Sequence, residues 1–270
     1  MSKAWIFADR NFEVSDIDER IYGSFAEHMG RCIYGGIYEP ESKFSDENGF
    51  RKDVMDLVKE MGVTIVRYPG GNFLSGYDWK DGIGARDKRP VRLDLAWHGL
   101  ETNQFGLDEF MAWTNKAKVE PMMAVNLGTN GLKEALDLIE YTNVSAKSKW
   151  AQERVKNGTE KPYDIKVWCL GNEMDGPWQL GHKNAKDYAT LAADVARGMR
   201  QIGEDLQLVA CGSSNRSMPT FGAWEETVLE KTYDLIDHVS LHTYYEDLGD
   251  TQEFLVISTD LDYMINEVCN

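Results

Sequence analysis

The sequence predicts an α/β fold of the (β/α)8 TIM-barrel class, and three observations support this prediction. Short apolar runs alternate six times with amphipathic helical stretches, a pattern typical of a parallel sheet joined by right-handed crossover helices. Polar residues gather where the apolar runs end, which is where barrel active sites lie. No GxGxxG motif follows the first run, so a dinucleotide-binding doubly wound sheet is less favoured.

Six strands and six helices are expected along the chain. The second, third and fifth strands are nearly continuous in apolar residues, as expected for strands buried on both faces. The expected strands are 20–25, 63–67, 121–126, 165–173, 207–212 and 238–244. The expected helices are 50–61, 107–118, 132–143, 184–202, 220–232 and 251–270. The first helix shows the i, i+3, i+4, i+7 spacing of one apolar face, at Val54, Leu57, Val58 and Met61.

The number of units falls short of a complete barrel. A barrel needs eight strands, and the sequence ends within the sixth expected helix. We therefore expect residues 19–270 to form an incomplete barrel of about six units. The edges of the first and last strands would then be open, which favours aggregation. The chain is interpreted as part of a longer protein.

Composition excludes several classes of partner. Lys and Arg number 29 against 45 Asp and Glu, which gives a net charge of −16 and a pI near 4.7. Nucleic acids and anionic membranes would repel such a chain. No stretch approaches the roughly 20 apolar residues of a membrane span, and we expect no secretory signal because charges occur early. The four cysteines are dispersed without a CxxC pair, which indicates a reduced, cytoplasmic protein.

The fourth expected strand ends in the strongest candidate for chemistry, Glu173, directly after Asn172. A carboxyl group at the mouth of an apolar barrel loses solvation, which raises its pKa. A general acid that protonates a leaving-group oxygen near neutral pH needs such a raised pKa. The neighbouring Asn172 amide can bind a substrate hydroxyl. The structural alternative is a glutamate that caps the next helix.

Other strand ends carry further candidates. Glu27 ends the first expected strand and Arg67 the second, so a buried salt bridge between them is the structural alternative to a binding role. His242 and Tyr244 end the sixth. His238 and His242 would lie roughly 13 Å apart on one strand and cannot share a metal. With no helical HxxxH and no Cys/His cluster, no metal site is expected.

Loop tryptophans complete the candidate site. Trp79 and Trp97 follow the second expected strand and Trp178 the fourth, beside Asn72 and Glu173. Indole faces pack against the C–H surfaces of sugars, whereas amides and carboxylates bind their hydroxyls. An exposed tryptophan is unfavourable unless it meets a ligand or a subunit. Each indole has the alternative of packing beneath its own loop. Together these side chains predict a carbohydrate site.

Five segments of the sequence stand out as a set: IYGSFAEH at 21–28, YGGIYEP at 34–40, VRYPGGNF at 66–73, WCLGNEMDGPW at 168–178 and SLHTYY at 240–245. These segments resemble, in the same order, the intracellular α-L-arabinofuranosidases of glycoside hydrolase family 51. The resemblance covers about residues 5–270, and the fourth segment is long and highly specific.

The resemblance implies a catalytic barrel, here incomplete over 19–270, and a C-terminal β-sandwich that this sequence lacks. Residues 1–18 would contribute a strand to that sandwich. It also implies retaining hydrolysis of terminal non-reducing α-L-arabinofuranosyl residues from arabinose-containing oligosaccharides. No cofactor is implied, and full-length members are expected to be homo-oligomers, often hexamers.

The resemblance also assigns roles. Glu173 matches the general acid/base, and Arg67 and His242 are supporting residues. The positions that match substrate-binding residues are Glu27, Asn72, Trp97, Asn172, Trp178 and Tyr244. The nucleophile of the family is a glutamate ending strand seven, which is not in this chain. Glu267 lies on the sixth expected helix and points away from the mouth, so we expect little or no hydrolysis by the chain alone.

Two alternatives remain at this stage. An endo-acting glycanase or β-glycosidase on the same barrel plan also carries Asn-Glu at strand four. A non-catalytic carbohydrate-binding fragment would use Glu27, Asn172 and Tyr244 without turnover.

Overall fold

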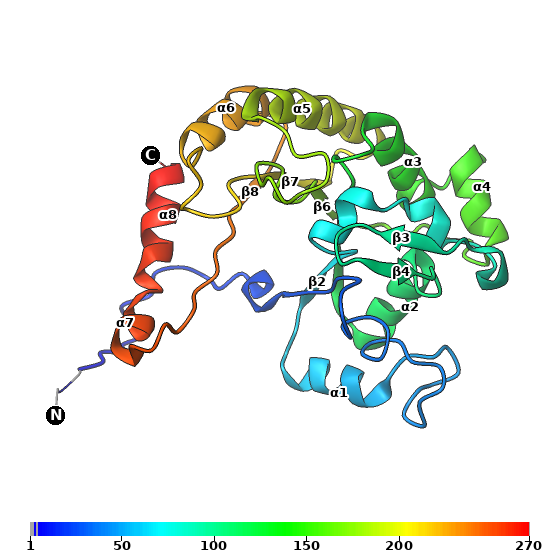
Figure 1. Cartoon of the computed structure of the whole chain (residues 1–270), viewed down its shortest axis with the longest axis horizontal. Coiled ribbons are helices and arrows are strands. Elements are labelled where there is room, and N and C mark those ends of the chain that lie inside the picture. The colour runs from blue at the N-terminus through cyan, green and yellow to red at the C-terminus, as the bar shows by residue number, and fades with distance from the viewer. Residues whose placement is uncertain (1–2, 4, 270) are drawn as a thin grey trace.

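The computed structural model describes residue 3 and residues 5–269, and their main feature is one open parallel sheet. Six strands are ordered along it as in the chain, and every neighbouring pair is parallel. Figure 1 shows helices arching around the outside of this curved sheet. The predicted α/β class, with six units of a partial barrel, is confirmed. The strands are β1 Ser24–Phe25, β2 Ile65–Tyr68, β5 Glu120–Val125, β6 Val167–Leu170, β7 Gln207–Cys211 and β8 His238–Ser240.

The predicted alternation of strands and helices is confirmed, with shifted boundaries. The expected final helix is two helices, α7 and α8. Helix α4, Lys149–Lys156, was not predicted, because only three of its eight residues are apolar and they mark no extended apolar face. The α-helices are α1 Lys52–Glu60, α2 Leu107–Ala117, α3 Leu132–Asn143, α4 Lys149–Lys156, α5 Ala185–Ile202, α6 Ala223–Thr232, α7 Thr251–Val256 and α8 Thr259–Cys269.

Strand β6 shows why the sheet is apolar on both faces. Val167 and Cys169 pack inside the curve of the sheet, whereas Trp168 and Leu170 pack against the surrounding helices. Successive side chains point to opposite faces of a strand, so an unbroken apolar run fills both layers. Packing on both faces holds the strands in position, and the loops that follow the strands are positioned with them.

Several expected strands are shorter in the structure. The first begins only at Ser24, because residues Glu19–Tyr22 form a short 3-10 helix capped by Asp18. The fourth ends at Leu170, because Gly171 and Glu173 have φ angles of +94° and +45°, which a strand cannot contain. The sixth ends at Ser240, so His242 and Tyr244 lie in an irregular segment.

The expected loop 73–105 is more ordered than predicted. It contains a short antiparallel hairpin in which β3 Arg92–Asp94 pairs with β4 Gly99–Glu101. Three 3-10 helices precede it, namely η2 Asn72–Gly76, η3 Trp79–Gly82 and η4 Arg86–Lys88. The hairpin lies near the carboxyl end of β2 and brings Trp97 to the candidate site.

The sheet edges are β1 and β8. Before β1, the described residues up to position 18 contain no strand and are exposed, including Trp5, Ile6 and Phe7. The division into residues 1–18 and 19–270 stays a prediction. In the described part of the chain, no helix has the length and apolar character needed to cross a bilayer.

Candidate active site

An open cavity of about 730 Å³ lies at the carboxyl edge of the sheet. Strands β1, β2, β6 and β8 and the hairpin β3–β4 each lead residues into it, because parallel strands present their carboxyl ends on one side. Eight of the predicted site residues line this cavity: Glu27, Arg67, Asn72, Trp97, Asn172, Glu173, His242 and Tyr244.

Glu173 is 8% exposed, and both of its carboxylate oxygens have partners. His242 Nδ1 lies 2.9 Å from Oε1, and Trp178 Nε1 donates to Oε2 at 2.8 Å. Burial alone would raise the pKa of Glu173, but the hydrogen bonds from His242 and Trp178, with the nearby Arg67 charge, hold this pKa below its ordinary value. The prediction of a raised pKa is therefore wrong for this site without a ligand.

Asn172 is buried beside Glu173 and is oriented by two neighbours. Its Oδ1 accepts a hydrogen bond of 3.1 Å from Arg67 Nη1, and its Nδ2 lies 3.4 Å from Gln179 Oε1. Gln179 also donates to the Ser75 hydroxyl. Sequence reasoning missed Gln179, because it ends no strand and belongs to no charged pair. The one signal in the sequence is that Gln179 lies in the same loop as Asn172.

Glu27 is 4% exposed and accepts two hydrogen bonds at the same oxygen. The Phe73 backbone N–H donates to Oε1 at 3.0 Å, and Trp97 Nε1 donates to it at 3.1 Å. The alternative salt bridge to Arg67 is not among the ion pairs of the described residues. Gly70, at φ +146°, makes room for Glu27, because a Cβ there would lie 2.4 Å from Glu27 Cγ.

The three candidate tryptophans separate into two groups. Trp97 and Trp178 are partly exposed, and each donates its indole N–H to a carboxylate of the site. Trp79 is buried and packs against Trp150, with ring centroids 5.1 Å apart. The packing alternative is therefore the right one for Trp79, whereas Trp97 lines the cavity and Trp178, which does not line it, contacts the site through Glu173.

Asn72 and Tyr244 also line the cavity, from the segments that follow β2 and β8. Asn72 is the first residue of η2, and Tyr244 is 78% exposed in the segment after β8. Glu267 is exposed on α8 and does not line the cavity, as predicted. Among the described residues, the carboxylates that line the cavity are Glu27 and Glu173, and no cluster of three or more potential metal ligands occurs.

Comparisons with known proteins point to one family. The family model described as "Alpha-L-arabinofuranosidase 1 domain" matches residues 57–259. The chain is 56% identical to an exo-α-(1→6)-L-arabinofuranosidase of Bifidobacterium longum, over 99% of this chain and 53% of that protein. It is 53% identical to an intracellular exo-α-(1→5)-L-arabinofuranosidase of Acetivibrio thermocellus, over 99% of this chain and 54% of that protein.

Solved structures give the same result. A family 51 α-L-arabinofuranosidase from Bifidobacterium longum superposes with a TM-score of 0.93 at 56% identity, over 94% of this chain and 52% of that one. An arabinose complex of the Thermotoga maritima α-L-arabinofuranosidase gives 0.87 at 44% identity, over 92% and 50%. The chain thus spans about half the length of the relatives it matches. Because the family model covers most of the sequence and the fold agrees, the chain belongs to the α-L-arabinofuranosidases of glycoside hydrolase family 51.

Proposed function

We propose that this chain is the larger part of the catalytic barrel of an exo-acting, intracellular α-L-arabinofuranosidase. The enzyme removes terminal non-reducing arabinofuranosyl residues from arabinose-containing oligosaccharides. The observation that carries the proposal is Glu173, a buried carboxylate held at both oxygens in a cavity with amide and carboxylate groups. The names of relatives support the substrate class and the location, since they include intracellular exo-acting arabinofuranosidases.

In the proposed mechanism Glu173 is the general acid/base of a retaining double displacement. It protonates the leaving oxygen in the first step and deprotonates water in the second. Its lowered pKa in the free site suits the second step. The first step requires a protonated Glu173, and a substrate that excludes water around it raises its pKa by desolvation. His242 and Trp178 fix the direction of the carboxyl group.

The remaining polar residues recognise the sugar. Glu27, Asn72, Asn172 and Tyr244 bind hydroxyl groups of the terminal arabinofuranosyl ring, and Trp97 and Trp178 flank it. Arg67 supports recognition indirectly through Asn172. A flat indole beside the ring excludes water and packs on its C–H surface. No step of this scheme uses a cofactor.

The second carboxylate of a retaining pair lies about 5–5.5 Å from the first and attacks the anomeric carbon. We assign this nucleophile to a later barrel strand of the intact protein, so residues 1–270 alone should bind arabinosides without turning them over. Robust release of nitrophenol from 4-nitrophenyl α-L-arabinofuranoside by the purified chain would contradict this assignment.

Calorimetry tests the substrate class on the chain itself. We expect an arabino-oligosaccharide to bind, and a Glu27→Ala variant to bind it more weakly. Preference for xylo- or gluco-oligosaccharides would instead favour a glycanase or β-glycosidase. Light scattering on the intact protein tests the expected homo-oligomer.

A further inference from the structure

The hairpin β3–β4 carries Trp97 at its turn and Glu101 at its end, and Glu101 contacts the residue that follows Glu27. We propose that the buried pair His28–Glu101 is a positioning pair that holds this hairpin, and through it Trp97, against Glu27. The proposal rests on the role in sugar binding proposed above for Glu27. Neither member of the pair lines the cavity, so both would act through other residues.

The pair joins three segments that are distant in the sequence. His28 Nδ1 lies 2.8 Å from Glu101 Oε2, and their side chains are 1% and 5% exposed. Glu101 Oε1 accepts from the Tyr34 hydroxyl and, at 2.6 Å, from the Asn103 backbone N–H. The other ring nitrogen of His28 lies 2.9 Å from the Tyr68 hydroxyl. The loop after β1, the end of β2 and the hairpin are therefore tied together at one buried point.

Both donors to Glu27 are attached to this point. The Phe73 ring stacks on the His28 imidazole, with centroids 4.6 Å apart and planes at 15°, and the Phe73 backbone N–H donates to Glu27 Oε1. Trp97 lies four residues before Glu101 in the same hairpin and donates to the same oxygen. Within the described residues both bonds go to Oε1, which leaves Oε2 for a sugar hydroxyl. Loss of the pair would loosen both donors together.

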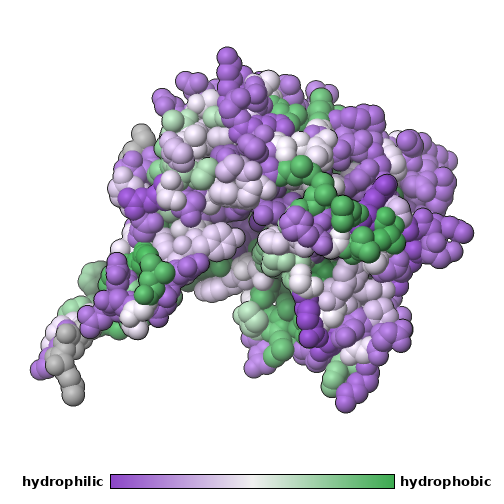
Figure 2. Space-filling view, viewed as in Figure 1, coloured by the Kyte–Doolittle hydropathy of each residue, from purple (hydrophilic) through white to green (hydrophobic). Residues whose placement is uncertain are grey.

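The hairpin has few other ties to the rest of the protein. Its ladder contains three residue pairs, and a short isolated hairpin is marginal in water. Its outer face is exposed at Leu93, Leu95 and Leu100, in the region where Figure 2 shows apolar side chains. Arg92 pairs with Asp81 at the surface, where ion pairs contribute little. Within residues 92–101, Glu101 therefore makes the most deeply buried polar contacts to other segments, while Arg89 holds the base of the hairpin through the Asn103 carbonyl.

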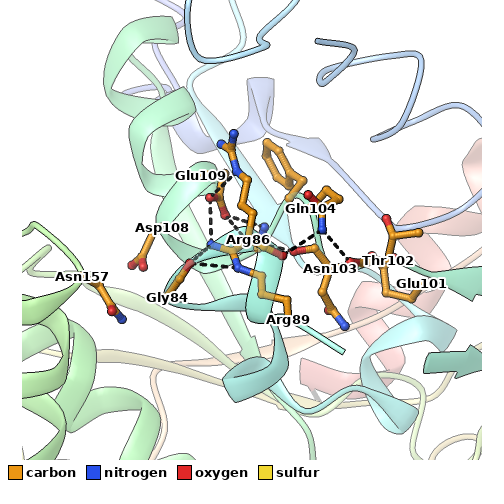
Figure 3. A network of polar contacts seen from close by, with 12 residues as sticks. Gly84, Arg86, Arg89, Glu101, Thr102, Asn103, Gln104, Asp108, Glu109 and Asn157 are labelled. Carbon is orange, nitrogen blue, oxygen red and sulfur yellow. Dashed lines mark hydrogen bonds and ion pairs between the residues drawn. The ribbon is translucent and has the colours of Figure 1, made fainter. Parts of the chain in front are cut away.

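A matched control lies close to Glu101. Glu109 is also a buried carboxylate and pairs with Arg86 and Arg89 at the start of α2, as Figure 3 shows. Among the described residues, Glu109, Arg86 and Arg89 make no hydrogen bond or ion pair with Glu27, Trp97 or His28, and the link toward Glu101 runs through the Asn103 backbone carbonyl, which accepts from Arg89. Glu109→Gln should therefore weaken a buried ion pair of the same loop region without moving Trp97.

The direct test is an NMR spectrum of the indole N–H groups. The chain has eight tryptophans, and Trp97→Phe identifies the Trp97 signal by its loss. We expect Glu101→Gln to move this signal toward its position in Glu27→Gln and to speed its hydrogen exchange by about tenfold. Glu109→Gln should leave the signal unmoved. His28→Gln provides a second variant if Glu101→Gln does not fold. A folded Glu101→Gln or His28→Gln protein with an unmoved Trp97 signal would overturn the proposal.

Calorimetry with an arabino-oligosaccharide tests the consequence for binding. Glu101→Gln should weaken binding by about tenfold in the wild-type background and by less than about twofold in the Trp97→Phe background, because it acts through Trp97. Equal losses in the two backgrounds would indicate a general structural effect and contradict the proposal. If the wild-type chain binds no arabinoside, the proposed function fails, while the Trp97 signal still decides the positioning role.

Discussion

The two cavity carboxylates, Glu27 and Glu173, are held in different ways. Glu27 receives a backbone N–H and an indole N–H at one oxygen, and both donors are attached to the buried pair His28–Glu101. Glu173 shares its two oxygens between His242 and Trp178. These two donors lie in irregular segments after β8 and β6, and the Trp178 side chain is half exposed.

This difference matches the two proposed roles. A carboxylate that orients a sugar hydroxyl works best when its geometry is fixed before binding. An acid/base must gain and lose a proton in each cycle, and its pKa depends on contacts that a substrate can alter. The proposed roles therefore assign fixed sugar recognition to Glu27 with its two donors, here called the Glu27 flank, and a carboxyl group of adjustable pKa to Glu173 with its two donors, the Glu173 flank. Substitutions in the Glu27 flank should then change sugar binding, whereas substitutions in the Glu173 flank should change turnover and the pKa of Glu173.

The largest expected effect is on the Glu173 flank, in the intact enzyme. Glu173→Ala should lower kcat/KM about 10³-fold for an arabino-oligosaccharide, whose poor leaving group needs protonation. For a dinitrophenyl arabinofuranoside, which needs none, the loss should be less than about tenfold. Steady-state kinetics on both substrates measures the contrast. Equal losses would argue against Glu173 as the acid.

The next effect concerns the Glu27 flank and the glycine behind it. Gly70→Ala places a Cβ 2.4 Å from Glu27 Cγ, so we expect about tenfold weaker arabinoside binding and about 1–3 kcal/mol lower unfolding free energy. Calorimetry and urea denaturation measure the two quantities.

Gly62→Ala is the matched control for that change. Gly62 also has a positive φ, of +71°, but a Cβ there would meet nothing within 4 Å. This variant should lose about 1 kcal/mol of stability from backbone strain and keep its sugar affinity. If the two alanine variants bind arabinoside equally well, crowding of Glu27 has no functional consequence.

The contrast between the two flanks also shows which features of the site could be predicted from the sequence. Glu173 and Asn172 were predictable because they follow the apolar strand β6 within three residues, and that position can be recognised from the local pattern. The direction of the Glu173 pKa shift was not predictable from the sequence. Burial, which raises this pKa, can be inferred from the apolar strand, but His242, which lowers it, lies 69 residues away in the sequence. The hairpin at 92–101 was missed because its strands have only three residues each, even though Val91, Leu93 and Leu95 alternate with the polar Arg92 and Asp94.

A smaller effect separates the two indole donors. Trp178→Phe removes a hydrogen bond that lowers the pKa of Glu173, so this pKa should rise. Trp97→Phe is the matched control, because its indole donates to Glu27 instead. Carbon-13 NMR of the glutamate side chains over a pH series measures both variants. An equal rise in the Glu173 pKa in the two variants would contradict the conclusion that Trp97 and Trp178 act on different carboxylates.

The smallest expected effect is the contribution of Glu173 to stability as the pH falls. Its folded pKa lies below the ordinary value of 4.5, so the folded state favours the ionised form. This contribution is fully present well above pH 4.5 and is lost as the pH falls through the folded pKa. The difference in unfolding free energy between wild type and Glu173→Gln should therefore shrink on acidification below 4.5, as urea titrations at several pH values would measure. A difference that grows in this range would mean that burial, and not the two donors, dominates at Glu173.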